Sequence, residues 1–173
     1  MTSFDGNVDR VILALANNLF IPGTPFLYYG NEIGMKDGNF AGDKKFRTDM
    51  DWKSAEIQEK DTKSILNRTK ELIKIRNDYK ALNNGELITL DSNDKQVFAF
   101  VRKLDKENIL VIFNYKDRET DNIEINLTPL GIDSAKLKVI FGSKLNDMTK
   151  ENKANFKLNK ISPFSFALYS IEE

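Results

Sequence analysis

The chain has 173 residues, which is enough for one or two small domains with a buried core. Lys plus Arg and Asp plus Glu each total 26, so the formal net charge is zero and favours neither nucleic acid nor an anionic membrane as a partner. The sequence contains no Cys and no His, which excludes disulfides, thiolate metal sites and imidazole acid–base catalysis.

The sequence predicts neither a signal peptide nor a membrane span. Residues Met1–Gly6 have neither the basic nor the apolar region of a signal peptide, and no apolar run approaches the roughly 20 residues of a membrane span. We therefore expect no membrane segment, and the compartment stays open between cytoplasmic and secreted.

The first third of the chain predicts a helix, a turn and a strand. Apolar residues recur at helical spacing over Val8–Phe20, and Pro22-Gly23 marks a turn. The next apolar run, Phe26–Tyr29, does not alternate, which is typical of a strand covered on both faces. Gly30 and Gly34 then free the backbone for a bend.

A long loop and a second helix follow. Residues Lys36–Ser54 are polar and weakly periodic, and we expect a loop that carries ligand contacts. A helical pattern returns over Asp61–Leu82, and Asn83-Asn84-Gly85 supplies its C-terminal stop.

After Gly85 the pattern changes to short β-branched or aromatic runs separated by turn residues, which favours an antiparallel sandwich. The alternation around Phe98, Phe100 and Phe113 predicts that these rings belong to the core. The fold class is α+β, with a domain boundary near residues 83–86. The predicted strands are 86–90, 96–103, 108–115, 122–127, 136–141, 155–158 and 165–171.

One string points to a known family. Residues 22–35, Pro-Gly-Thr-Pro-Phe-Leu-Tyr-Tyr-Gly-Asn-Glu-Ile-Gly-Met, closely resemble the eighth barrel strand of the α-amylase superfamily, glycoside hydrolase family 13. The resemblance implies that residues 1–84 are the last helix–strand–helix portion of a (β/α)8 TIM barrel. It implies that residues 85–173 are the all-β C-terminal sandwich domain, and Pro163–Tyr169 resembles that domain's last strand.

The resemblance also implies an activity. Enzymes of this family are retaining α-glycosidases that act on α-glucosidic bonds of starch-type oligosaccharides, and they use carboxylic residues on either side of the scissile bond. The family places its catalytic carboxylates upstream of the part matched by this chain. We therefore expect no catalytic residue, no metal and no cofactor in it, and we predict that the chain alone is inactive.

The loop holds the candidate substrate-binding residues. Residues 42–52 resemble the family segment Asp-(three residues)-Arg that ends in Met-x-Trp, which implies that Asp43 and Arg47 bind a sugar. A carboxylate and a guanidinium bind adjacent hydroxyls as acceptor and donor. The segment departs from the family pattern at Lys44 and Asp49, where proline is usual, and the spacing of Asp43 and Arg47 also fits a local ion pair.

Other polar and aromatic residues here are assigned structural roles. Glu32 is interpreted as structural, and Tyr28 and Tyr29 as packing residues. Asp49 and Asp51 are not interpreted as a catalytic dyad, because nothing in the sequence indicates an environment that would tune such a pair for catalysis.

Two other functions stay open: a non-catalytic carbohydrate-binding or docking module, which a row of exposed aromatics on the sandwich would favour, and a truncated structural remnant. The expected partners are an α-glucan or maltooligosaccharide, bound through the intact parent enzyme. Because a barrel strand at 26–29 has two unpaired edges, we also expect self-association or pairing with the missing barrel portion.

Overall fold

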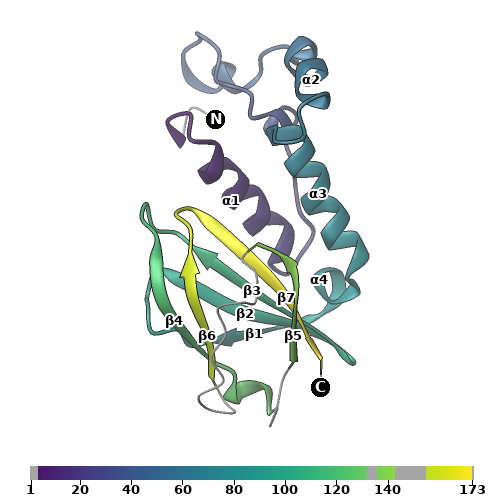
Figure 1. The fold of residues 1–173 in the computed structure, drawn as a ribbon. Coiled ribbons are helices and arrows are strands. Elements are labelled where there is room, and N and C mark those ends of the chain that lie inside the picture. The colour runs from purple at the N-terminus through teal and green to yellow at the C-terminus, as the bar shows by residue number, and fades with distance from the viewer. Residues whose placement is uncertain (1–3, 132–135, 143–154, 173) are drawn as a thin grey trace. The chain divides into compact units, whose positions relative to one another are not determined.

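The computed structural model describes residues 4–131, 136–142 and 155–172. The chain forms two compact units, and its elements are drawn in Figure 1. The helical unit comprises the residues up to Leu19 together with Thr24–Ile75. The sandwich unit comprises Phe20–Gly23 and everything from Arg76 onward. The mixture of helices and antiparallel sheet confirms the predicted α+β class.

The helical unit is built around one amphipathic helix. Its apolar stripe, which includes Ile12, Ala16 and Leu19, is buried, as the helical periodicity predicts. The Arg68 guanidinium binds the Asp9 carboxylate at 3.2 Å, which links two helices across the unit. The elements that begin in this unit are α1 (Val8–Phe20), η2 (Asn31–Ile33), η3 (Gly42–Phe46), α2 (Trp52–Glu59) and α3 (Ile65–Asp78).

Three expectations for this region were wrong. The predicted strand at 26–29 is irregular, because no strand among the described residues pairs with it, and the Phe26 side chain is 83% exposed. The end of the loop, predicted to run to Ser54, forms the start of α2. The predicted helix 61–82 is interrupted at Tyr79, whose backbone is extended, and continues as α4 (Lys80–Asn84) in the sandwich unit.

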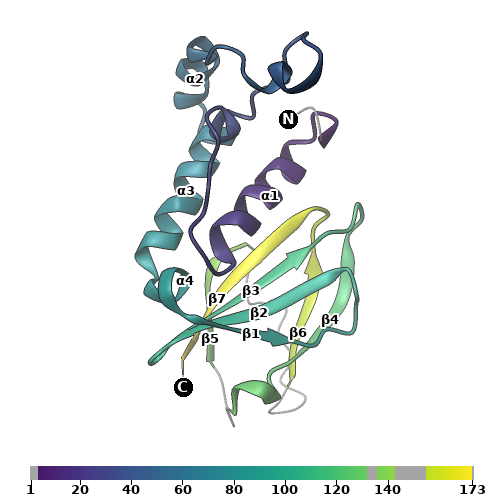
Figure 2. The same ribbon diagram turned by 180° about the vertical axis from the view of Figure 1, so that it is seen from behind.

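The described residues of the sandwich unit form antiparallel strands in two sheets. Figures 1 and 2 show these sheets from opposite sides. The larger sheet has the order β1-β2-β3-β7-β5, and β4 pairs with β6. Every predicted strand is present within about three residues of its predicted ends. The strands are β1 (Glu86–Leu90), β2 (Val97–Leu104), β3 (Glu107–Asn114), β4 (Thr120–Asn126), β5 (Lys136–Phe141), β6 (Asn155–Ile161) and β7 (Ser165–Glu172), with a short η4 (Thr128–Leu130) after β4.

Both sheets contribute to one apolar core. Val97, Ala99 and Val101 of β2 pack in it with residues of β4 and β6. The Phe156 and Tyr169 rings, one from each sheet, have centroids 5.5 Å apart. This face-to-face burial of alternate residues confirms the predicted sandwich.

The other face of the larger sheet carries an aromatic ladder. The Phe100 ring lies 5.3 Å from Phe98 and 5.9 Å from Phe113, and Phe113 stacks on Tyr115. Phe100 and Phe113 are fully buried, as predicted, whereas Phe98 is 36% exposed. The ladder is therefore a packing feature with two partly exposed ends rather than an exposed row of rings.

Candidate substrate-binding loop

The loop begins at a tight turn that requires glycine. Gly30 has φ +86°, and the Met35 N–H donates to the Gly30 carbonyl at 2.8 Å. A Cβ at Gly30 would lie 2.8 Å from the Met35 sulfur, which is closer than real side chains approach. Gly34 is also left-handed and ends η2, so both glycines make the bend that the sequence predicts.

The loop is then closed by hydrogen bonds across it. The Gly38 N–H donates to the Lys45 carbonyl at 2.8 Å. The Tyr29 hydroxyl donates to the Thr48 carbonyl at 3.0 Å and so attaches the loop to the segment before the turn. The sequence gives no sign of this second contact, because a tyrosine hydroxyl carries no periodic signal. Tyr29 therefore helps to place the backbone next to Arg47.

Asp43 and Arg47 are presented at the surface of this loop. Asp43 lies within η3, and Arg47 is the residue that ends it. Both side chains are exposed, and in the described part of the chain no hydrogen bond or ion pair joins the carboxylate to the guanidinium. The cation between them, Lys45, instead pairs with Asp37 at 3.5 Å. The two predicted sugar-binding groups are thus available to a ligand.

Several aromatic side chains in the same stretch of chain are also exposed. Trp52 is 70% exposed at the start of α2, and Phe40 and Phe46 are also exposed. Tyr28 and Tyr29 lie with ring centroids 4.5 Å apart, but both are more than 40% exposed, so the packing role expected of them is restricted to their mutual contact. Apolar ring faces next to hydroxyl-binding groups suit a sugar ring.

Neighbouring side chains also shift the pKa of Tyr29. The hydrogen bond with Tyr28, and the negative charge of Asp49, raise the pKa of Tyr29, while Arg47 opposes that shift. A tyrosine phenol is already neutral at physiological pH, and the shift is in the direction that keeps the proton that the hydroxyl donates to Thr48.

Asp51 serves α2 rather than a catalytic pair. Its Oδ1 accepts a hydrogen bond from the Ser54 N–H at 2.9 Å, the geometry of a helix N-cap. Asp49 and Asp51 line a pocket of about 540 Å³ with Met35, Thr48 and Gln58. Asp43 and Arg47 do not line it, so the structure does not bring the candidate binding pair and this pocket together.

Glu32 contributes through its backbone. Its carbonyl accepts a 3.4 Å hydrogen bond from the Thr69 hydroxyl, which links η2 to α3. In the parts of the chain that the structure describes, no group of three or more carboxylates has the arrangement of a metal site.

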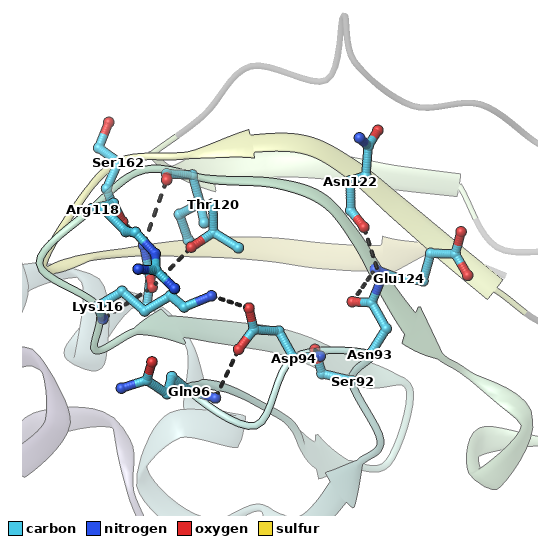
Figure 3. A network of polar contacts seen from close by, with 12 residues as sticks. Ser92, Asn93, Asp94, Gln96, Lys116, Arg118, Thr120, Asn122, Glu124 and Ser162 are labelled. Atoms are coloured by element: carbon cyan, nitrogen blue, oxygen red, sulfur yellow. Dashed lines mark hydrogen bonds and ion pairs between the residues drawn. The ribbon is translucent and has the colours of Figure 1, made fainter.

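A second polar cluster lies in the sandwich unit, where Figure 3 shows its contacts. Buried Asn114 donates to the Ser162 carbonyl at 2.8 Å and accepts from the Lys116 N–H at 3.1 Å. The Lys116 ammonium pairs with Asp94, whose other oxygen accepts from the Gln96 N–H. These groups satisfy one another and fasten three loops together, so the cluster is structural.

Comparison with known proteins agrees with this architecture. Residues 87–166 match the family described as Maltogenic Amylase, C-terminal domain. Alpha-amylase 3 of Dictyoglomus thermophilum is 32% identical over 134 residues, covering 65% of this chain and 27% of that protein. A cyclomaltodextrinase of Geobacillus thermopakistaniensis is 31% identical over 176 residues, covering 99% of this chain and 27% of that protein.

Solved structures show the same fold. The debranching enzyme from Nostoc punctiforme superposes with a TM-score of 0.77 at 23% identity, covering 98% of this chain and 32% of that one. The chain spans about a quarter of the length of the two curated relatives above. None of the helices in residues 4–131, 136–142 and 155–172 has the length and apolar character needed to cross a bilayer. The chain therefore corresponds to the C-terminal region of enzymes of the α-amylase superfamily, glycoside hydrolase family 13.

Proposed function

We propose that this chain supplies the C-terminal part of a glycoside hydrolase that acts on α-glucosidic bonds of starch-type oligosaccharides. Residues 1–84 contribute the end of the catalytic barrel, and residues 85–173 form the appended all-β domain. The observation that carries the proposal is the loop: Asp43 and Arg47 are exposed, unpaired with each other and flanked by exposed aromatic rings.

Asp43 and Arg47 act as a substrate-binding pair in this proposal. The carboxylate accepts hydrogen bonds from sugar hydroxyls, and the guanidinium donates to neighbouring ones. Trp52 offers its exposed ring face to the apolar side of a sugar. Relatives carry the names alpha-amylase, cyclomaltodextrinase and neopullulanase, which supports an α-glucan or maltooligosaccharide as the ligand class.

The catalytic carboxylates are not among the residues of this chain in our proposal. Asp51 is used as a helix cap, and among the described residues the Asp49 carboxylate forms no hydrogen bond or ion pair. The purified chain should therefore give no turnover of a chromogenic maltooligosaccharide. Clear hydrolysis by the pure chain would contradict the assignment, and Asp49→Asn and Asp51→Asn would then be the first variants to assay.

The binding pair is tested in a complete enzyme. The matching quarter of the Geobacillus cyclomaltodextrinase, which aligns with 99% of this chain, is replaced by this chain. In an active chimera, Asp43→Ala and Arg47→Ala should each lower kcat/KM for cyclodextrin by about tenfold to a hundredfold, equivalent to losing one or two charged hydrogen bonds. Lys44→Ala is the matched control, and equal activity of all three variants would contradict the role of the pair.

The exposed aromatic residues of the helical unit also predict association. Phe26, Phe40 and Trp52 are 83%, 60% and 70% exposed, and large exposed apolar side chains that gather in one patch mark an interaction surface. We propose that it is covered by a second copy of this chain or by the remainder of the barrel. Sedimentation of the purified chain should show a dimer or larger species, and a strictly monomeric folded chain at micromolar concentration would contradict this.

A further inference from the structure

The side chain of Arg102 is buried in the sandwich unit, and no carboxylate among the described residues pairs with it. It lies on β2 and is 1% exposed. Its Nε and Nη2 both donate to the Gly85 carbonyl, at 3.2 and 2.9 Å. Its Nη1 donates to the carbonyls of Phe20 and Leu82, at 2.9 and 3.0 Å. The charge is thus balanced by carbonyl dipoles rather than by an opposite charge.

These three carbonyls come from places where helices end. Phe20 is the last residue of α1, and Leu82 and Gly85 lie at the end of α4. The final carbonyls of a helix have no partner inside it and carry partial negative charge, so a cation there is favourable. Arg102 therefore caps two helix ends with one guanidinium, a geometry that a planar fork allows and an ammonium does not.

A second arginine holds the same turn from another element. Arg76, near the end of α3, is buried, and its Nη2 donates to the Gly23 carbonyl at 2.9 Å. The Asn83 amide donates in turn to the Arg76 carbonyl at 2.7 Å, which connects this contact to α4. The Phe20 ring packs 6.1 Å from Phe166 of β7. The turn Phe20–Gly23 is thereby attached to the sandwich at both its ends.

Electrostatics agrees with a structural use of both cations. Burial lowers the pKa of Arg102, and so does the charge of nearby Arg76; burial also lowers the pKa of Arg76. Burying two cations close together costs free energy of folding. A fold retains such a pair when the backbone carbonyls that the cations bind must be held in place.

We infer that Arg102 and Arg76 are positioning residues that make the Phe20–Gly23 turn part of the sandwich unit. They hold the carbonyls at both ends of a turn that interrupts the helical unit in sequence. The turn directly precedes Thr24–Gly30 in the chain, the segment that leads to the Asp43–Arg47 loop. The consequence for sugar binding depends on the proposed function, whereas the attachment of the turn does not.

The inference is tested by hydrogen exchange on the full chain. Arg102→Lys keeps the charge but loses the fork, and should accelerate exchange of the amides at Leu19–Gly23 by at least about tenfold while β4 and β6 exchange as in the wild type. Arg118→Lys, an exposed arginine of the same unit, is the control and should change neither region.

Two results would overturn the inference: unchanged exchange at the turn, or equal acceleration across the turn and all strands, which would show a general loss of stability alone. Should Arg102→Lys fail to fold, Arg76→Lys decides, because it acts on Gly23 from outside the sheet. Faster exchange confined to the turn supports the inference, and unchanged or uniform exchange contradicts it. Because no sugar is involved, failure here leaves the proposed substrate-binding pair untouched.

Discussion

The sandwich unit and the loop-bearing part of the helical unit use their large side chains in opposite ways. In the sandwich, Phe100 and Phe113 are fully buried, and Arg102 finds three carbonyl partners. Between Thr24 and Trp52, the rings of Phe26 and Trp52 are mostly exposed. The large side chains of the sandwich are therefore buried against other residues of the same unit. Those of the loop-bearing segment are left exposed, where another protein or a ligand can contact them.

The largest test of this comparison removes one phenylalanine from each region. Phe100→Ala should lower the free energy of unfolding by about 3–5 kcal/mol, because it leaves a cavity in the aromatic ladder. In the monomer, Phe26→Ala should change it by less than about 0.5 kcal/mol, because the ring is 83% exposed in the single chain. Urea titration of both variants measures this, and equal losses would refute the contrast.

A polar substitution sharpens the comparison at a smaller scale. Asn114→Ala should cost about 2 kcal/mol, because it leaves the buried Ser162 carbonyl and the Lys116 N–H without their partner. Asn39→Ala, in the exposed loop, should be neutral within about 0.5 kcal/mol. Thermal unfolding of both variants provides the measurement, and a neutral Asn114→Ala would show that the cluster in Figure 3 does not hold the loops.

The smallest expected effect is the dependence of folding stability on acidic pH. The hydrogen bond from Lys116, followed by that from the Gln96 N–H, lowers the pKa of Asp94 below its ordinary value. A lowered carboxyl pKa adds stability above the unfolded value of about 3.9, and this stability is lost as the pH falls through the folded value.

Asp94→Asn should therefore cost about 1 kcal/mol at pH 7, and the difference from wild type should shrink steadily below about pH 4. Urea midpoints measured between pH 3 and 7 check the sign. A difference that grows on acidification would show that the pair does not lower the Asp94 pKa.

Sequence periodicity predicted the sandwich much better than the loop region. Alternating residues such as Val97, Ala99 and Val101 meet their partners within the chain, so the strands form where the pattern indicates. The run at Phe26–Tyr29 has the composition of a buried strand, yet the described residues provide no neighbouring strand. Composition alone does not reveal whether a partner is present.

Other differences have local causes. Helix α2 has no apolar stripe, and its one sequence signal is the N-cap pair Asp51 and Ser54. The break at Tyr79 has no glycine or proline to mark it. Alternation along β2 puts Arg102 on the same face as Phe98 and Phe100, but alternation does not tell which face is buried. The carbonyl partners of Arg102 come from residues 17–82 positions away in the sequence.

The sequence predicted which residues belong to the candidate site, but not the contacts that hold their loop in place. The family motif selects Asp43 and Arg47, and their exposure agrees with a binding role that stays a proposal. The attachment of this loop by Tyr29 to Thr48 depends on a hydroxyl-to-backbone contact across 19 residues, which no spacing rule identifies.

Native-state hydrogen exchange of the wild-type chain at a concentration where it is monomeric tests the comparison most directly. The account predicts that amides of β2, β3 and β7 exchange slowest, and that amides between Thr24 and Asp51 exchange at least about a hundredfold faster. Protection of residues 24–51 equal to that of the strands, in the monomer, would contradict the claim that this segment lacks its packing partner.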